Sequence, residues 1–223
     1  MKVDLDHPEM TIEPAEALEE RCRWFLEPPK PSRYGALYLD QIDDPGNELR
    51  WLIDGWLTQG EKSVIAGASR AGKSFFALEI AMCIAFGLPL FGHAVRKGAV
   101  VYQTGEGALG LKKRLRAQRA ARGFAFSRET PFVLLQNSID IYSDKQGVFA
   151  LIEEIKETTA VFDVRLELVV IDTLATASVG ADEISGKDMG IVMENVKLIN
   201  QSTGAHVMLV HHLSAQGRVR GHT

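Results

Sequence analysis

A glycine-rich octapeptide at residues 67–74 contains the residues of this chain with the clearest chemistry. It reads Gly67, Ala68, Ser69, Arg70, Ala71, Gly72, Lys73 and Ser74, which fits the phosphate-loop pattern G-x-x-x-x-G-K-[ST]. Glycines let the backbone curl so that successive N–H groups point at phosphate oxygens. The Lys73 ammonium group would neutralise the β- and γ-phosphates, and the Ser74 hydroxyl would ligate Mg²⁺. The octapeptide and Phe75 after it therefore predict a binding site for ATP and Mg²⁺.

The segments on either side of this loop support that interpretation. Residues 63–66 are typical of a short buried strand, and residues 75–86 are typical of an apolar helix. This strand–loop–helix order is the context that the motif requires. The helix N-terminus adds partial positive charge beside the phosphates. A glycine loop with a chance lysine is therefore the disfavoured alternative.

A second candidate site residue, Asp172, follows the apolar run at residues 168–171. On a central strand this carboxylate would lie at the C-terminal edge of the sheet, where open α/β sheets bind their ligands. Paired with the loop about 100 residues earlier, Asp172 is predicted to hold the Mg²⁺ hydration shell as a Walker B aspartate does. Thr173 is a candidate for positioning that carboxylate.

Glu106 follows another strand-like run and lies between two glycines, Gly105 and Gly107. A carboxylate there could polarise the water that attacks ATP. An acid in a turn or at a helix N-terminus is the alternative, and the residue chemistry alone leaves both open.

Two adjacent histidines, His211 and His212, end the run at residues 206–212. Because side chains alternate along a strand, the two rings should lie on opposite faces of the sheet. One ring could reach the γ-phosphate and respond to hydrolysis, whereas the structural alternative is a polar strand end. Zinc binding is disfavoured, because adjacent histidines diverge and no third-ligand pattern lies nearby.

Three further segments allow two interpretations each. The predicted helix at residues 107–122 carries six positive charges, which indicate either a solvated face or contact with DNA or a neighbouring subunit. The small-residue segment 173–188 is expected to be a long loop that either touches a DNA backbone or merely connects two elements. Arg218 and Arg220 could reach the γ-phosphate of a neighbouring subunit, or belong to a disordered tail.

The elements that must position these residues alternate between strand and helix. Strands are expected at residues 63–66, 99–103, 132–136, 167–171 and 206–210, and helices at 73–86, 107–122, 145–159 and 187–202. The strands are nearly continuous apolar runs, as in a parallel sheet buried on both faces. The sequence therefore predicts an α/β fold with three layers around a mostly parallel central sheet. Residues 1–45 differ: an acidic helical arm over 14–26 and a proline-rich linker are expected there.

Composition sets broader limits on the function. Of 223 residues, 46% are apolar and 24% charged, which are ordinary values for a globular protein. The formal net charge of −4 gives no general reason to expect nucleic acid, although a local basic channel is compatible with it. Cys22 and Cys83 fit no metal spacing, and neither a signal core nor a membrane span is evident, so we expect a cytoplasmic protein.

The motifs in this order resemble the RepA-type branch of the RecA-fold P-loop ATPases, the hexameric replicative helicases of plasmids and phages. The matching segments are 67–74, 102–107, 168–174, 182–190 and 209–212. The resemblance implies a RecA-like domain over 46–223, with Glu106 as catalytic base and His212 coupling the phosphate state to DNA contacts. It also implies a homohexameric ring that moves along single-stranded DNA. In two respects the chain departs from the family. No lysine follows the histidine pair closely, and the domain is expected to lack C-terminal strands.

Together, the motifs and the resemblance predict a Mg²⁺-dependent ATPase that works on single-stranded DNA in replication. Lys73, Glu106 and His212 are the expected catalytic residues. Three rival hypotheses remain: a non-motor regulator or recombination mediator, a small-molecule kinase, and an inactive fragment that only binds nucleotide or partners.

Overall fold

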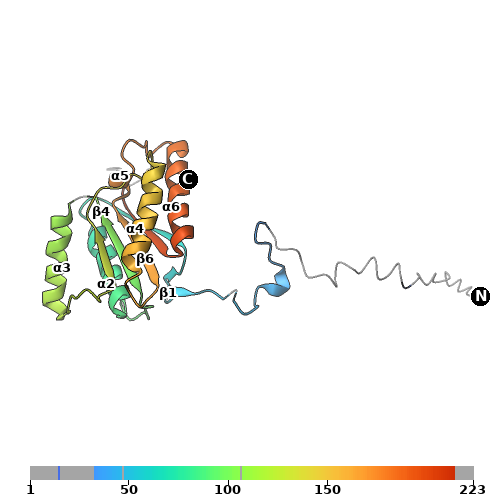
Figure 1. Ribbon diagram of the computed structural model, residues 1–223, viewed down its shortest axis with the longest axis horizontal. Helices are drawn as coiled ribbons and strands as arrows, with labels where there is room; N and C mark the ends of the chain where they lie inside the picture. The colour runs from blue at the N-terminus through green and yellow to red at the C-terminus, as the bar shows by residue number, and fades with distance from the viewer. Residues whose placement is uncertain (1–14, 16–32, 47, 106, 214–223) are drawn as a thin grey trace, which may run out of the picture. The chain divides into compact units, whose positions relative to one another are not determined.

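The computed structural model describes residues 15, 33–46, 48–105 and 107–213 (Figure 1). The chain divides into two units, Met1–Glu48 and Leu49–Thr223. In the first unit, the described part of the chain contains a short 3₁₀ helix, η1 (Leu39–Gln41). Apart from Ala15, the predicted helix over residues 14–26 lies outside the described residues, so the N-terminal arm stays a prediction.

The second unit is built on a five-stranded parallel sheet with the order β3-β7-β6-β4-β5. Its strands are β3 (Lys62–Gly67), β4 (Ala99–Thr104), β5 (Phe132–Leu135), β6 (Leu166–Asp172) and β7 (His206–His212). All five predicted strands are confirmed. The central strands β4 and β6 are buried along their whole length, because their continuous apolar runs meet helices on both faces.

Helices cover the two faces of the sheet and form the outer layers (Figure 1). They are α2 (Lys73–Phe86), α3 (Ala108–Arg122), α4 (Lys145–Thr159), α5 (Leu174–Ala177) and α6 (Gly186–Thr203). One apolar core joins α2 and Leu111 of α3 to side chains such as Val100 and Val170. The other core joins α4 and α6 to side chains such as Val101 and Val169 on the opposite face. The three-layer α/β class predicted from the sequence is therefore confirmed.

One local prediction needs correction, and one element of the fold was not predicted. The expected loop over 173–188 is interrupted by the short helix α5, and α6 already begins at Gly186. A capping box between Thr173 and Thr176 starts α5, and such a four-residue helix is too short to show an apolar period. An antiparallel hairpin, β1 (Trp51–Ile53) and β2 (Leu57–Thr58), was not predicted, because its strands are shorter than the alternation that identifies a strand.

No helix within the described ranges has the length and apolar character needed to cross a membrane.

Candidate nucleotide site

The glycine-rich loop connects β3 to α2 at the C-terminal edge of the sheet. Gly72 stands at the helix N-cap with φ of 86°, a left-handed conformation that a residue with a Cβ adopts only under strain. Among the described residues, no side chain caps this end of α2, and its first turn carries no acidic residue. The first N–H groups of the helix therefore point into the loop, which is the arrangement that binds a phosphate group.

The ammonium group of Lys73 lies inside the loop and is nearly buried, with 6% of the residue exposed. Its Nζ donates to the carbonyl oxygens of Gly67 at 2.9 Å and Ala68 at 2.8 Å, and lies 2.9 Å from Nδ1 of His212. An ammonium group has only donors, so Nδ1 accepts in this contact and the neutral ring carries its proton on Nε2. The predicted catalytic residues Lys73 and His212 are therefore in direct contact.

Asp172 at the end of β6 meets the start of α2. Its Oδ1 accepts a hydrogen bond of 3.0 Å from the Ser74 hydroxyl, which brings together the two residues predicted to bind metal. One strand, β7, lies between β3 and β6, so the two residues meet across it. Their hydroxyl and carboxylate oxygens are ligands that Mg²⁺ prefers. Within the described ranges no three His, Cys, Asp or Glu side chains could share an ion, so other ligands would be water and phosphate, which Mg²⁺ favours.

Tyr102 of β4 completes this cluster, although the sequence analysis did not assign it to the site. Its hydroxyl donates to Oδ2 of Asp172 at 2.6 Å, and the residue is fully buried. Burial, and then the neighbouring carboxylate, raise the pKa of Tyr102 well above its ordinary value, so the hydroxyl keeps its proton. The sequence did contain one signal for Tyr102, which is a tyrosine within an apolar strand. Its hydroxyl must find a hydrogen-bond partner when the strand is buried.

Lys73, Ser74 and His212 border a pocket of about 310 Å³, a volume at the small end of the range for ligand sites. It is lined by Ser69, Arg70, Gly72, Lys73, Ser74, Phe75, Arg114 and His212. Phe75 is 59% exposed, and the guanidinium carbon of Arg114 lies 4.3 Å from the centre of its ring. Arg114 was expected only as one charge of a basic helix. Its place beside the loop could not be read from sequence spacing, because it depends on how α3 packs beside α2.

Glu106 lies outside the described residues, but the strand that precedes it in the sequence, β4, ends beside Asp172. Thr104 pairs with Asp172 in the sheet, and the N–H of Gly105 donates to the Asp172 carbonyl oxygen at 2.7 Å. A Cβ at position 105 would collide with the side chain of Thr176, so β4 can approach α5 this closely only with glycine there. Gly105 therefore lies directly beside the end of β6. The roles predicted for Glu106, and for Arg218 and Arg220 beyond residue 213, stay predictions.

The positive charges of α3 are divided between several neighbours. Arg114 faces the pocket, and Arg122 forms an ion pair with Glu79 of α2. Burial acts to raise the pKa of Glu79, but hydrogen bonds from Gln118 and Arg122 outweigh it and hold that pKa below its usual value. Lys113 and Arg116 are exposed. The interpretation of α3 as a merely solvated face thus fails for Arg114 and Arg122.

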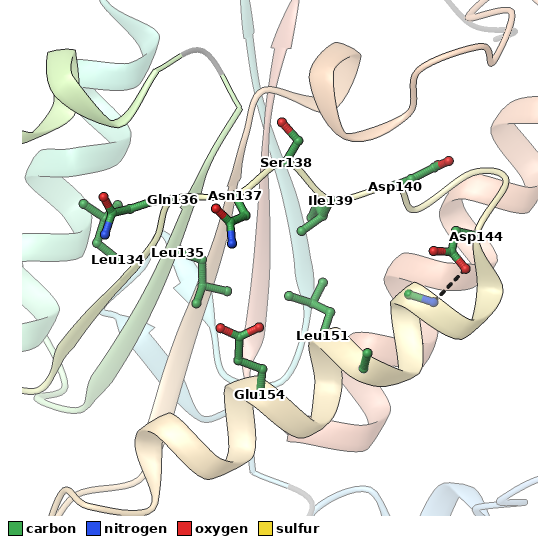
Figure 2. Close-up of a pocket in the computed structure, with 12 residues that line it drawn as sticks. Leu134, Leu135, Gln136, Asn137, Ser138, Ile139, Asp140, Asp144, Leu151 and Glu154 are labelled. Atoms are coloured by element: carbon green, nitrogen blue, oxygen red, sulfur yellow. Dashed lines mark hydrogen bonds between the residues drawn. The ribbon is translucent and has the colours of Figure 1, made fainter.

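A larger cavity of about 490 Å³ lies between the end of β5 and α4, at the opposite edge of the sheet from β3 (Figure 2). Two of its three carboxylates, those of Asp140 and Asp144, are already engaged with the backbone, and the third is that of Glu154. Asp140 accepts hydrogen bonds from the N–H groups of Tyr142 and Ser143, and Asp144 caps α4 through Gly147. Because these groups stabilise a turn and a helix end, the smaller pocket around the glycine-rich loop is the better nucleotide site.

Comparison with known proteins gives one family match that covers most of the chain. The model of a family described as "AAA domain" matches residues 28–218. No curated protein matches. Among solved structures, a KaiC-like protein from the hyperthermophilic archaeon Pyrococcus horikoshii OT3 matches with a TM-score of 0.48 and 16% sequence identity, over 76% of this chain and 68% of that chain.

Proposed function

Because this chain belongs to the AAA domain family, we propose that it hydrolyses ATP with Mg²⁺ and couples hydrolysis to binding of, or movement along, single-stranded DNA, as a replicative helicase does. The contact between Ser74 and Asp172 carries the first half of this proposal. Residues 98 positions apart in sequence meet at the mouth of a phosphate loop, at 3.0 Å. That pairing of a hydroxyl with a carboxylate is what a Mg²⁺–nucleotide complex requires.

Each group of the site has a task in this mechanism. The N–H groups at the start of α2 bind and orient the phosphates, and Lys73 exchanges one of its present acceptors for a phosphate oxygen. Ser74 and Asp172 would hold Mg²⁺, which neutralises charge that develops on the phosphate oxygens. Glu106 would orient the attacking water. Catalysis then consists of positioning and electrostatic stabilisation, with no covalent intermediate on the protein.

Two observations support the link to DNA. Helix α3 carries six Lys and Arg residues and no acidic one, and it lies at the outside of the second unit (Figure 1). In addition, β7 joins the site to the chain that follows it, because His212 contacts Lys73. A change at the γ-phosphate would therefore be transmitted through His212 to the residues beyond β7. The exposed Phe75 at the rim of the pocket is a surface that a neighbouring subunit of a ring could cover.

The decisive experiment compares the ATPase rate with and without single-stranded DNA and measures the mass of the particle under the same conditions. We expect DNA to stimulate turnover and the mass to correspond to a homo-oligomer, with six subunits as the expected number. A monomer whose turnover ignores DNA but transfers phosphate to an added small molecule would contradict the proposal. Such a result would identify a small-molecule kinase.

A second candidate is a non-motor regulator that uses the same site as a switch. The segment between α5 and α6 favours it, because Val179 is 69% and Ile184 is 66% exposed there, close in sequence to Asp172. Exposed apolar side chains suit a loop that docks onto a partner when the γ-phosphate orders it. Strand-displacement assays separate the candidates: a helicase unwinds a forked duplex, whereas a switch shows nucleotide-dependent DNA binding without unwinding.

A further inference from the structure

The hydroxyl of Tyr102 is placed differently from the other groups around the nucleotide site. It approaches from within the apolar core, on the face of the sheet that α2 covers. Strand alternation puts Val170 and Asp172 of β6 on that same face, and Tyr102 pairs directly with Val170 in the register. The Tyr102 hydroxyl therefore reaches the carboxylate from the apolar core, whereas the Ser74 hydroxyl reaches it from the first turn of α2.

The two oxygen atoms of Asp172 are divided between these neighbours. Ser74 donates to Oδ1 at 3.0 Å, and Tyr102 donates to Oδ2 at 2.6 Å. The Tyr102 oxygen also lies 3.5 Å from the Ser74 carbonyl oxygen, but its single proton serves the shorter contact with the charged acceptor. Its ring is stacked against Phe132 of β5, with 6.3 Å between the ring centres. A buried ring that packs in the α2 core and stacks on its neighbour fixes the direction of the hydroxyl.

We propose that Tyr102 is a positioning residue for Mg²⁺, which holds Oδ2 of Asp172 so that Oδ1 stays directed at the metal position beside Ser74. This inference rests on the proposed ATPase function and adds a residue that acts through Asp172. The partners of a metal-ligating carboxylate orient it, and their loss typically weakens metal binding by about 10–100-fold. A purely packing role predicts instead that phenylalanine serves equally well, because it fills the same volume.

The test replaces Tyr102 by Phe in the full chain. The measurement is the Mg²⁺ concentration that gives half-maximal binding of a fluorescent, non-hydrolysable ATP analogue, with Mn²⁺ binding followed by electron paramagnetic resonance as a second readout. We expect Tyr102→Phe to raise the Mg²⁺ midpoint by about 10-fold. Tyr142→Phe is the matched control, because its hydroxyl interacts with Asp188, and it should keep the wild-type midpoint. A midpoint in Tyr102→Phe that is unchanged or lowered overturns the inference.

A double-mutant cycle separates positioning from general loosening of the fold. In an Asp172→Asn background, adding Tyr102→Phe should produce no further change in the Mg²⁺ midpoint, because the carboxylate that Tyr102 orients is gone. A further shift of the same size in that background would show that Tyr102 acts through the fold alone. Thermal unfolding of each variant reports stability separately.

A donor placed at the same position should restore the effect. Incorporation of 4-aminophenylalanine at position 102 supplies an N–H donor and is expected to return the midpoint to within about 3-fold of wild type, the usual uncertainty of such single-contact effects. 4-Fluorophenylalanine, which has no donor, should not. This pair also keeps the inference testable if Tyr102→Phe fails to fold. If the wild-type protein binds the analogue without any dependence on Mg²⁺, the proposed function fails. If the wild-type protein requires Mg²⁺ but the Tyr102 variants have the same Mg²⁺ midpoint, the proposed function stands and only the inference about Tyr102 fails.

Discussion

The Lys73 ammonium group is held by three acceptors of its own chain, which are two loop carbonyl oxygens and one ring nitrogen. All three are neutral, so the positive charge in this nearly buried group is solvated by dipoles and lacks a counterion among these three contacts. A phosphate oxygen is a far better partner for it. The site is therefore organised in advance around an anion, and this charge would contribute to nucleotide binding as proposed.

Replacement of Lys73 by Ala should weaken ATP binding by about 10–100-fold, because its charge-assisted hydrogen bond of about 1.5–3 kcal/mol to a phosphate oxygen is lost. Replacement of Glu106 by Gln should keep ATP binding and abolish turnover, since the amide cannot take a proton from water. Isothermal titration and a phosphate-release assay measure the two effects. Undiminished binding in Lys73→Ala would refute the site, and normal turnover in Glu106→Gln would return Glu106 to a capping role.

Sequence reasoning found the residues of the site that depend on local order and missed those that depend on packing. The octapeptide at residues 67–74, Asp172 and His212 could be identified because the motif and the strand ends place them. Tyr102 and Arg114 could not. Their roles depend on the register of β4 against β6 and on the packing of α3 beside α2. Neither relation is encoded in the spacing of residues along one segment.

At the scale of elements, the small hairpin is attached to the N-terminal edge of the sheet by a buried histidine. Nδ1 of His206 lies 2.7 Å from the Thr58 carbonyl oxygen of β2, and Nε2 lies 2.8 Å from the Ser63 hydroxyl of β3. Because one ring joins β2, β3 and β7, a hairpin that was too short to predict is nevertheless part of the core. The long strands and helices could be predicted from their apolar runs and from their alternation along the chain, whereas this connection could not.

This contact predicts a dependence of stability on pH. Burial, and secondarily Lys62, lower the pKa of His206 below 6.5, although the Thr58 bond and Glu61 act in the opposite direction. Below about pH 6.5 the unfolded chain therefore takes up a proton that the folded ring does not, so stability falls as the pH falls through the folded pKa. Chemical denaturation between pH 7.5 and about 5 should show this loss. His206→Gln should reduce it. An equal slope in the variant and in the wild-type protein would contradict the assignment.

At the scale of the whole molecule, charge is distributed unevenly over a chain with net charge −4. Helix α3 is uniformly basic, although the average composition gives no reason to expect nucleic acid. Its exposed side chains Lys113 and Arg116 lie on the same helix as Arg114, which borders the nucleotide pocket. A polyanion bound along α3 would therefore lie close to the candidate nucleotide site of this AAA domain.

Reversal of two of these charges, Lys113→Glu with Arg116→Glu, should weaken binding of labelled single-stranded DNA. The slope of log affinity against log salt concentration should also become shallower, by the equivalent of about one to two phosphate contacts. Fluorescence anisotropy at several salt concentrations measures both quantities. The matched control is Lys145→Glu with Lys197→Glu, which makes the same change in net charge on α4 and α6, both on the other face. An equal loss in both variants would show that only overall charge matters and would remove α3 from the proposed DNA surface.

The carbonyl oxygen of Gly67 accepts two hydrogen bonds: one from Lys73 at 2.9 Å and one from the N–H of Leu213 at 3.0 Å, immediately after β7. The start of the glycine-rich loop and the residue after β7 thus share a single acceptor atom. An anion that draws the Lys73 ammonium group toward itself would weaken the first of these hydrogen bonds and leave the second, so occupancy of the loop would bear directly on the end of β7.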